Sequence, residues 1–280
     1  MIVDLHTHST ASDGTTPPDV LVRDARAAGL DVLALTDHDT SAGWDAAAAA
    51  LPTGLTLVRG AEISCVRDGI SLHLLAYLFD PEEPALAGAL LELRESRTRR
   101  AEQMARRLEA DGTGVTWERV QELAGGTVGR PHVAQALIEL GHVADIPGAF
   151  VPEWIGTNGR YWVAKAELDV LDAIRLVVGA GGVAVFAHPA ASARGRTVDA
   201  SVVADMAAAG LHGLEVDHVD HDAAAKAELT GLAAELGLLT TGSSDFHGTN
   251  KSVRLAENTT SPEMYERLVA AASGSPVLAA

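Results

Sequence analysis

The chain has 280 residues, 47% hydrophobic but only 4% aromatic, so it can bury a large core built mainly from Ala, Val and Leu. Its formal net charge of −17 argues against broad electrostatic binding of nucleic acid. It does not argue against an anionic substrate, because bound cations reverse the sign of a pocket. The lone Cys65, the lack of a signal-peptide pattern and the lack of a long apolar run lead us to expect a cytoplasmic protein with no membrane contact and no obligate protein partner.

Strands and helices alternate over the first part of the chain. A helix is predicted over about 17–28, because Pro17 is a start signal and Gly29 a stop signal. An Ala-rich helix is expected to run to about Leu51. The predicted strands are 2–8, Asp31–Thr36, Leu55–Ile63 and Ile70–Leu78.

The alternation stops between about Pro84 and Gly148, where the pattern is helical. The helical stretches are Leu90–Glu109, Trp117–Leu123 and Pro131–Leu140. Strands then return, each followed by a helix, at Val183–Ala187, Leu214–Val216 and Leu239–Gly242. Repeated strand–helix units favour a parallel sheet or barrel, in which chemistry is placed at the C-terminal ends of the strands. We therefore expect the helical block to form a cap over that end.

Histidines and carboxylates occur repeatedly at or just beyond the predicted strand ends. His6 and His8 are two residues apart, so they point to the same face of a strand. Glu62 is a charge within an otherwise apolar strand, where a carboxylate is rare unless it is paired or bound to metal. The full set is His6, His8, Asp13, His38, Glu62, His73, His188, Asp245 and His247.

Each of these residues has an ordinary structural explanation when taken alone. Asp13 lies in a turn, where Asp is common, and Asp39 or Thr40 can cap a helix beside His38. His73 alone reads best as a satisfied core histidine. Unrelated causes would have to place such residues at almost every strand end, so we interpret the set as one polynuclear metal site.

The motifs in this set resemble the PHP (polymerase and histidinol phosphatase) domain of the amidohydrolase superfamily. The matching segments are His6-Thr7-His8, Thr36-Asp37-His38-Asp39, Glu62, His73, Ala187-His188-Pro189 and Ser244-Asp245-Phe246-His247. The resemblance implies an α/β fold, a distorted (β/α)7 TIM-like barrel with an inserted helical cap subdomain. The barrel would comprise residues 1–82 and 166–280, and the cap residues 83–165. In the cap, Ala164-Lys165 stands where relatives are expected to have a proline-containing turn.

The resemblance also implies three divalent metal ions, most often manganese, with zinc or iron as alternatives. One ion would take His6, His8, Glu62 and Asp245, a second Glu62, His73 and His188, and a third Asp13, His38 and His247. Neighbouring ions lower the pKa of water, so that hydroxide is available near neutral pH. Glu62 and Asp245 are thus implied to be catalytic.

The predicted cap contains a candidate phosphate site. Arg130 and His132 lie at a predicted helix start with Pro131 between them, and a helix N-terminus with such neighbours suits an anion. The alternative is an ordinary surface helix start. Arg97 and Arg100 share a helix face and are further candidates, although arginines on a helix are usually only surface residues.

The Gly129-Arg130-Pro131-His132 segment resembles one PHP subgroup, the 3′,5′-nucleotide bisphosphate phosphatases and 5′-to-3′ exoribonucleases. That resemblance implies hydrolysis of the 3′-phosphate ester of a 5′-phosphorylated nucleotide or short oligoribonucleotide, with release of a 5′-mononucleotide. His218 would protonate the leaving oxygen or contact substrate, unless its role is purely structural; Asn250 and Lys251 are weaker candidates for substrate contact. The alternatives are a histidinol-phosphate phosphatase and a non-catalytic PHP module.

Overall fold

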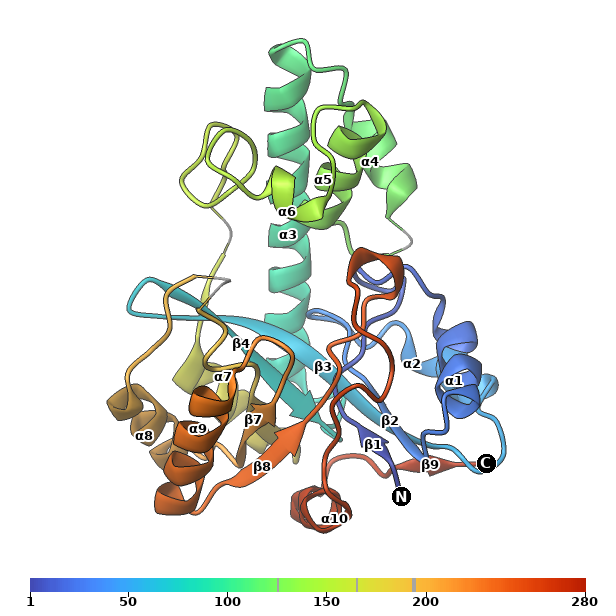
Figure 1. Cartoon of the computed structure of the whole chain (residues 1–280), viewed down its shortest axis with the longest axis vertical. Helices are drawn as coiled ribbons and strands as arrows, with labels where there is room; N and C mark the ends of the chain where they lie inside the picture. Colours follow the sequence, from blue (N-terminus) through green and yellow to red (C-terminus); the bar gives the residue numbers. More distant parts are fainter. Residues whose placement is uncertain (125, 165, 193–194) are drawn as a thin grey trace.

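A computed structural model describes residues 1–124, 126–164, 166–192 and 195–280. The sheet and the helices around it form one body, and a group of cap helices stands above it on the long helix α3 (Figure 1). Lys165, which bears on the expected cap–barrel junction, lies outside the described residues. Within the described ranges, no helix is both long enough and apolar enough to cross a bilayer.

Seven strands follow one another through hydrogen bonds in the order β1-β2-β3-β4-β6-β7-β8. Their bounds are β1 Val3–Asp4, β2 Val32–Leu35, β3 Thr56–Arg67, β4 Ile70–Tyr77, β6 Val183–Phe186, β7 Gly213–Asp217 and β8 Leu239–Gly242. A parallel bridge between Thr7 and Phe246 joins the segments that follow β1 and β8. The sheet is therefore a nearly closed barrel, which confirms the expected fold class.

The direction of β4 differs from a simple repeat of parallel strand–helix units. β4 runs antiparallel to both β3 and β6. Asp68 and Gly69 connect β3 to β4, and both have positive φ, 50° and 68°, as a tight two-residue hairpin requires. Because of the reversal, His73 near the start of β4 pairs with Ser64 in the later half of β3. His73 is thereby placed at the end of the barrel where the parallel strands finish.

Helices cover the outside of the barrel and pack on it with mostly aliphatic side chains. α1 is typical: Pro18 lies in its first turn, and Leu21, Val22 and Ala25 face the core. The covering helices are α1 Pro18–Ala27, α2 Trp44–Ala49, α7 Val170–Gly179, α8 Ala200–Ala208, α9 Ala223–Leu236 and α10 Pro262–Ala271. The smaller elements are the short strands β5 Leu168–Asp169 and β9 Leu278–Ala279, which both pair with β3, and the 3₁₀ helix η2 Gly248–Asn250.

Helix α3, Pro84–Ala110, takes part in two hydrophobic cores. In its first half Leu86, Leu90 and Leu93 belong to the barrel core. In its second half, residues such as Met104 and Leu108 pack in a separate core formed with the cap helices. The cap helices are α4 Trp117–Leu123, α5 Arg130–Glu139 and α6 Ile146–Ala149. One continuous helix therefore connects the core of the cap to the core of the barrel.

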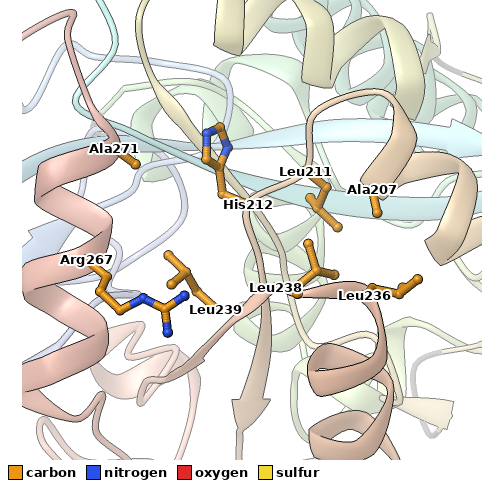
Figure 2. Close-up of a pocket in the computed structure, with 9 residues that line it drawn as sticks. Ala207, Leu211, His212, Leu236, Leu238, Leu239, Arg267 and Ala271 are labelled. Atoms are coloured by element: carbon orange, nitrogen blue, oxygen red, sulfur yellow. The ribbon is translucent and has the colours of Figure 1, made fainter.

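A hollow of about 320 Å³ lies at the N-terminal ends of β7 and β8, between α8, α9 and α10 (Figure 2). Its lining is mostly leucine and alanine, with the polar side chains of His212 and Arg267. None of the nine predicted metal ligands lines it. This hollow is thus separate from the chemistry at the other end of the strands.

Candidate metal centre

The structure brings the nine predicted ligands together at the C-terminal end of the parallel strands. His6 and His8 follow β1, His38 follows β2, and His188 follows β6. The other five are Asp13 in the loop after β1, Glu62 in β3, His73 in β4, and Asp245 and His247 after β8. Three groups of these side chains have donor atoms close enough to share an ion.

The first group consists of His6, His8, Glu62 and Asp245, all buried. The two Nε2 atoms of the histidines are 3.1 Å apart, and each is 3.1 Å from Glu62 Oε2. Asp245 Oδ1 lies 3.5 and 3.6 Å from the same two nitrogens. Ligands at about 2.1 Å around a tetrahedral ion would be about 3.4 Å from one another. The four atoms thus already have the spacing of a coordination shell.

The second group consists of His38, Glu62 and His73. His73 Nδ1 lies 2.7 Å from Glu62 Oε1, and His38 Nδ1 lies 3.2 Å from Glu62 Oε2. Both nitrogens are buried, yet neither makes a hydrogen bond of acceptable geometry within the described residues. Such orphaned donor atoms fit a metal ligand set. His188, which the resemblance assigns to this ion, also reaches Glu62, with its Nε2 3.1 Å from Oε1.

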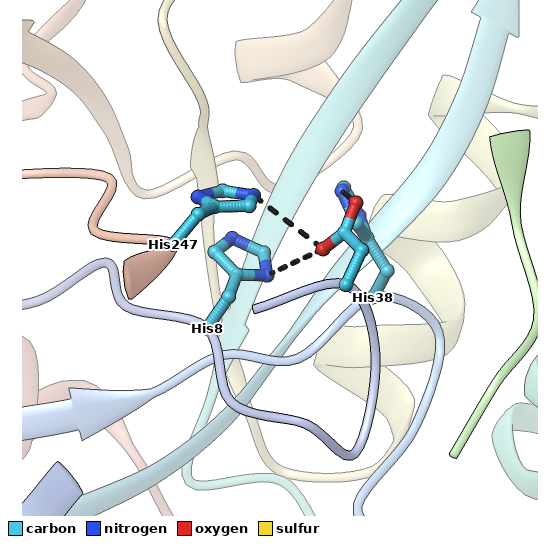
Figure 3. A group of neighbouring side chains, drawn as sticks. His8, His38 and His247 are labelled. Atoms are coloured by element: carbon cyan, nitrogen blue, oxygen red, sulfur yellow. Dashed lines mark ion pairs between the residues drawn. The ribbon is translucent and has the colours of Figure 1, made fainter. Parts of the chain in front are cut away.

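The third group adds His8 to the three residues expected, Asp13, His38 and His247. Asp13 Oδ1 lies 3.4 Å from His247 Nε2 and 3.7 Å from His8 Nδ1. His38 Nε2 lies 3.7 Å from the other carboxylate oxygen of Asp13. Figure 3 shows the three imidazole rings gathered around this carboxylate. His8 and His38 therefore each present one nitrogen to this group and the other to a neighbouring group.

The electrostatics of the cluster favour a cation. Burial lowers the pKa of His6, but the carboxylates of Glu62, Asp245 and Glu215 outweigh it and raise that pKa well above its usual value. Burial raises the pKa of Glu62, but the surrounding histidines hold it well below its usual value. Burial also lowers the pKa of His247 to about 4. Ionised carboxylates and neutral imidazoles are the forms that bind metal, and cations would compete with protons for them.

Two buried carboxylates that we did not predict support the cluster. Glu215 in β7 accepts a hydrogen bond from His6 Nδ1 at 3.1 Å and another from the His188 backbone N–H at 2.7 Å. This leaves His6 Nε2 free to face the cluster. Asp4 accepts bonds from the backbone N–H groups of Ser244 and Ala256, and burial raises its pKa to about 6. Glu215 carried the same sequence signal as Glu62, a charge within an apolar strand.

His218 and Lys251 both contact the carboxylate of Asp245. His218 is completely buried, and its Nδ1 accepts the backbone N–H of Asp220 at 3.0 Å. Its Nε2 therefore carries the proton and donates to Asp245 Oδ2 at 3.2 Å. Lys251 Nζ lies 2.5 Å from the same oxygen. Both predicted residues are thus within the cluster.

The predicted phosphate-binding residues also lie close to one another. Burial lowers the pKa of Arg130 to about 10, with a further contribution from Arg97. Burial, together with the charges of Arg130 and Arg97, lowers the pKa of Arg100 to about 9. Among the described residues, no carboxylate lies within ion-pair distance of Arg100 or Arg130. Three neighbouring guanidinium groups, of which only Arg97 is paired with a carboxylate, form a site that an anion would stabilise.

Not every nitrogen of these residues is available to a ligand. Arg100 Nε donates to the Val163 carbonyl at 2.9 Å, and Arg97 is paired with Asp39. The guanidinium of Arg130 lies over the Phe150 ring, 4.7 Å from its centroid. His132 Nδ1 accepts the Gly129 N–H at 3.0 Å, so its remaining nitrogen, Nε2, carries a proton that it can donate.

The fold and the site together define a barrel with a cluster of potential metal ligands, here called the metal-type cluster, at the C-terminal end of its strands. An arginine site on a helical cap lies next to this cluster. Comparison with known proteins agrees with this class. The model of the PHP domain matches residues 4–111. A 3′,5′-nucleoside bisphosphate phosphatase of Chromobacterium violaceum is 34% identical, over 90% of this chain and 89% of its own. A 5′-3′ exoribonuclease of Haemophilus influenzae is 35% identical, over 91% and 93%.

Two further relatives extend the comparison. A phosphoribosyl 1,2-cyclic phosphate 1,2-diphosphodiesterase of Eggerthella lenta is 34% identical, over 89% of this chain and 95% of its own. A crystal structure of a metal-dependent phosphoesterase from Bifidobacterium adolescentis superposes with a TM-score of 0.90 at 35% identity, over 97% and 96% of the two chains. The chain belongs to the PHP domain family, and its curated relatives include a 3′,5′-nucleoside bisphosphate phosphatase and 5′-3′ exoribonucleases.

Proposed function

We propose that the chain is a metal-dependent phosphoesterase that hydrolyses the 3′-phosphate ester of 5′-phosphorylated nucleotides and releases 5′-mononucleotides. The substrate would be a 3′,5′-bisphosphate nucleotide or a short oligoribonucleotide. The observation that carries the proposal is the arginine site of Arg97, Arg100 and Arg130 beside the cluster around Glu62. Two anion sites close together suit a substrate with two phosphoryl groups. The names of the Chromobacterium and Haemophilus relatives support the same reading.

The donor set suits three divalent cations, one for each group. Mixed imidazole and carboxylate ligands favour manganese, iron or zinc over magnesium, and we take manganese as the first choice. Such ions, when bound, supply Lewis acidity and lower the pKa of water. Cys65 is the single cysteine of the sequence, and its thiol is buried; this usage fits a reducing compartment, so we place the protein in the cytoplasm.

The protein's own side chains would bind the metals, bind the 5′-phosphate and supply protons. Glu62 and Asp245 hold the cluster together, because each carboxylate faces several of its histidines. Arg130, with His132 and one face of Arg100, would bind the 5′-phosphate. His218 and Lys251 carry protons next to Asp245 and would assist the leaving oxygen or the phosphoryl group.

A substrate panel with added Mn²⁺ tests the proposal. We expect adenosine 3′,5′-bisphosphate and short 5′-phosphorylated RNA to be hydrolysed with release of AMP or the first 5′-mononucleotide. A strong preference for histidinol phosphate would contradict it and favour the histidinol-phosphate phosphatase. A protein purified without metal and inert on every substrate, even after Mn²⁺ is added, would instead indicate a non-catalytic module.

The Eggerthella relative supports a second candidate, hydrolysis of a cyclic phosphate diester on ribose. Such a substrate carries a cyclic diester that the cluster would have to open, and the same arginine site could hold a further phosphate. A ribose cyclic phosphate therefore belongs in the panel. If it were turned over with a kcat/KM at least as high as that of the bisphosphate, this second function would replace the first.

A further inference from the structure

The guanidinium of Arg97, in α3, is fastened to the barrel by two residues. Arg97 Nε donates to Asp39 Oδ2 at 2.5 Å, and Nη2 donates to Ser64 Oγ at 2.5 Å. The backbone N–H and hydroxyl of Ser64 donate to the same carboxylate at 2.7 and 2.9 Å. Asp39 and Ser64 are completely buried, and only 15% of the Arg97 side chain is exposed. A guanidinium with such partners is held in one orientation.

Asp39 is itself fixed on all sides. Its backbone has a φ of 55°, a left-handed conformation that costs free energy for a residue other than glycine. The surrounding structure compensates: Asp39 N–H donates to the Glu62 carbonyl at 3.0 Å, and the Asp39 carbonyl accepts from Arg94 Nη1 at 3.2 Å. These contacts hold the Asp39 carboxylate in place, and the Arg97 guanidinium that it binds is held in place with it.

Arg97 lies between the metal-type cluster and the start of α5. Its third nitrogen, Nη1, is 3.9 Å from the position that a Cβ on Gly129 would occupy, just before Arg130. Burial lowers the pKa of His38, and the charge of Arg97 lowers it further. The same two causes act on Arg130. The guanidinium is therefore close to both sites that the proposed function assigns to phosphoryl groups.

We propose that Asp39 is a positioning residue that makes hydrolysis depend on the second phosphoryl group of the substrate. The inference rests on the proposed function. Asp39 and Ser64 take two nitrogens of Arg97, so that Nη1 faces the space between the two sites. A substrate with both phosphoryl groups gains this contact in addition to Arg130. A simple phosphate monoester, which fills only the site at the cluster, gains little.

The test is a double-mutant cycle on substrate selectivity. The measured quantity is kcat/KM for adenosine 3′,5′-bisphosphate divided by kcat/KM for p-nitrophenyl phosphate, with added Mn²⁺. We expect Asp39→Asn and Arg97→Ala each to lower this ratio by about tenfold or more, mainly through KM for the bisphosphate. Because Asp39 acts through Arg97, the double variant should lie within about twofold of Arg97→Ala.

Two further variants separate positioning from general damage. Asp37 precedes His38 in the sequence, as Asp39 follows it. The Asp37 side chain is buried and accepts hydrogen bonds from Ser9 and Ser12. Asp37→Asn should lower turnover of both substrates and leave their ratio unchanged. Ser64→Ala removes one of the two anchors of Arg97 and should lower the ratio by a smaller factor than Asp39→Asn. Melting curves and manganese content are measured for every variant.

An unchanged ratio in folded Asp39→Asn, or losses that multiply in the double variant, would overturn the inference. If Asp39→Asn does not fold, Ser64→Ala decides, and an unchanged ratio there overturns it as well. A wild-type protein that fails to hydrolyse the bisphosphate would overturn the proposed function and this inference with it. Wild-type hydrolysis with the ratio unaffected by Asp39→Asn would remove the inference alone.

Discussion

Individual buried carboxylates fix the orientation of the imidazole rings in the cluster. Glu215 is the clearest case, because it fixes the His6 ring and the backbone of His188 at once. Burial raises the pKa of Glu215, but His6, His218 and His188 outweigh burial and lower this pKa to about 2. The folded pKa is thus below the ordinary value of 4.5. Its stabilising contribution is therefore present above pH 4.5 and is lost as the pH falls from 4.5 towards 2.

Glu215→Gln should destabilise the metal-free protein at pH 7 by about 3 kcal/mol, the equivalent of this pKa difference. It should also weaken manganese binding about 10- to 100-fold, because the amide no longer favours the required His6 tautomer. Urea unfolding and metal titration measure the two effects. Glu228→Gln removes an exposed carboxylate and serves as the control. Equal behaviour of the two variants would contradict the role of Glu215.

Arg130→Ala should lower kcat/KM for 5′-phosphorylated substrates by about 10- to 100-fold, because one charged contact to phosphate is lost. The kcat/KM for p-nitrophenyl phosphate should change by less than about threefold. Arg106→Ala is the matched control, because Arg106 is an exposed cap arginine paired with Glu102. Equal losses on both substrates would refute the assigned role of Arg130.

The residue types of the cluster could be predicted, but apart from Glu215, a charge within an apolar strand, their partners could not. Histidines at strand ends stand out in a sequence because a strand end needs no imidazole. A supporting carboxylate such as Asp4 or Asp39 gives no comparable signal, because the same residue also caps helices and forms turns. The pairing of Arg97 with Asp39 joins residues 58 apart in sequence, and only the fold reveals it.

At the scale of elements, helix α5 of the cap is tied to the loop that carries Asp13. Gln135 Nε2 donates to Asn250 Oδ1 at 3.1 Å, and Asn250 Nδ2 donates to the Asp13 carbonyl at 2.9 Å. Asn250, predicted as a weak candidate for substrate contact, thus has its amide engaged between cap and barrel. The Thr127 N–H also donates to the Ala11 carbonyl at 3.1 Å. These bonds connect the phosphate site to one of the metal-type groups.

Gln135→Ala should therefore lower kcat/KM for the bisphosphate by about three- to tenfold, the value of one hydrogen bond, while the overall fold is kept. Steady-state kinetics and a melting curve provide the measurement. Gln121→Ala, at an exposed position of α4, should leave both unchanged. Kinetics of Gln135→Ala that match those of Gln121→Ala would show that the link between cap and barrel does not matter.

The order of strands and helices could be predicted from hydrophobic pattern, but the direction of one strand could not. Alternation of apolar residues is the same in parallel and antiparallel strands. The Asp68-Gly69 pair between β3 and β4 was the available signal, since it is a frequent two-residue hairpin turn. The two-residue strands β5 and β9 are too short to give any periodicity.

At the scale of the whole molecule, the barrel closes around a centre that gathers buried carboxylates and imidazoles from most of its strands. Cations that bind this centre bind the folded state only, because the unfolded chain holds the ligands far apart in sequence. Metal occupancy should therefore stabilise the fold as a unit.

Addition of Mn²⁺ to the metal-free protein at about 100 times Kd should stabilise it by about 2.7 kcal/mol per site. For a chain of this size we expect a rise in Tm of about 5–10 °C for each site that is filled. His38→Ala should show less than half of the rise, because His38 offers nitrogens to two of the three groups. Mg²⁺ should stabilise less than Mn²⁺. Identical melting curves with and without Mn²⁺ would contradict this account.

Anomalous diffraction at the manganese edge, from crystals grown with Mn²⁺, tests the central claim most directly. We expect peaks inside the three donor groups, the first of them bounded by His6 Nε2, His8 Nε2, Glu62 Oε2 and Asp245 Oδ1. A map without peaks there, with these side chains turned away from one another, would contradict the claim that they form a metal centre.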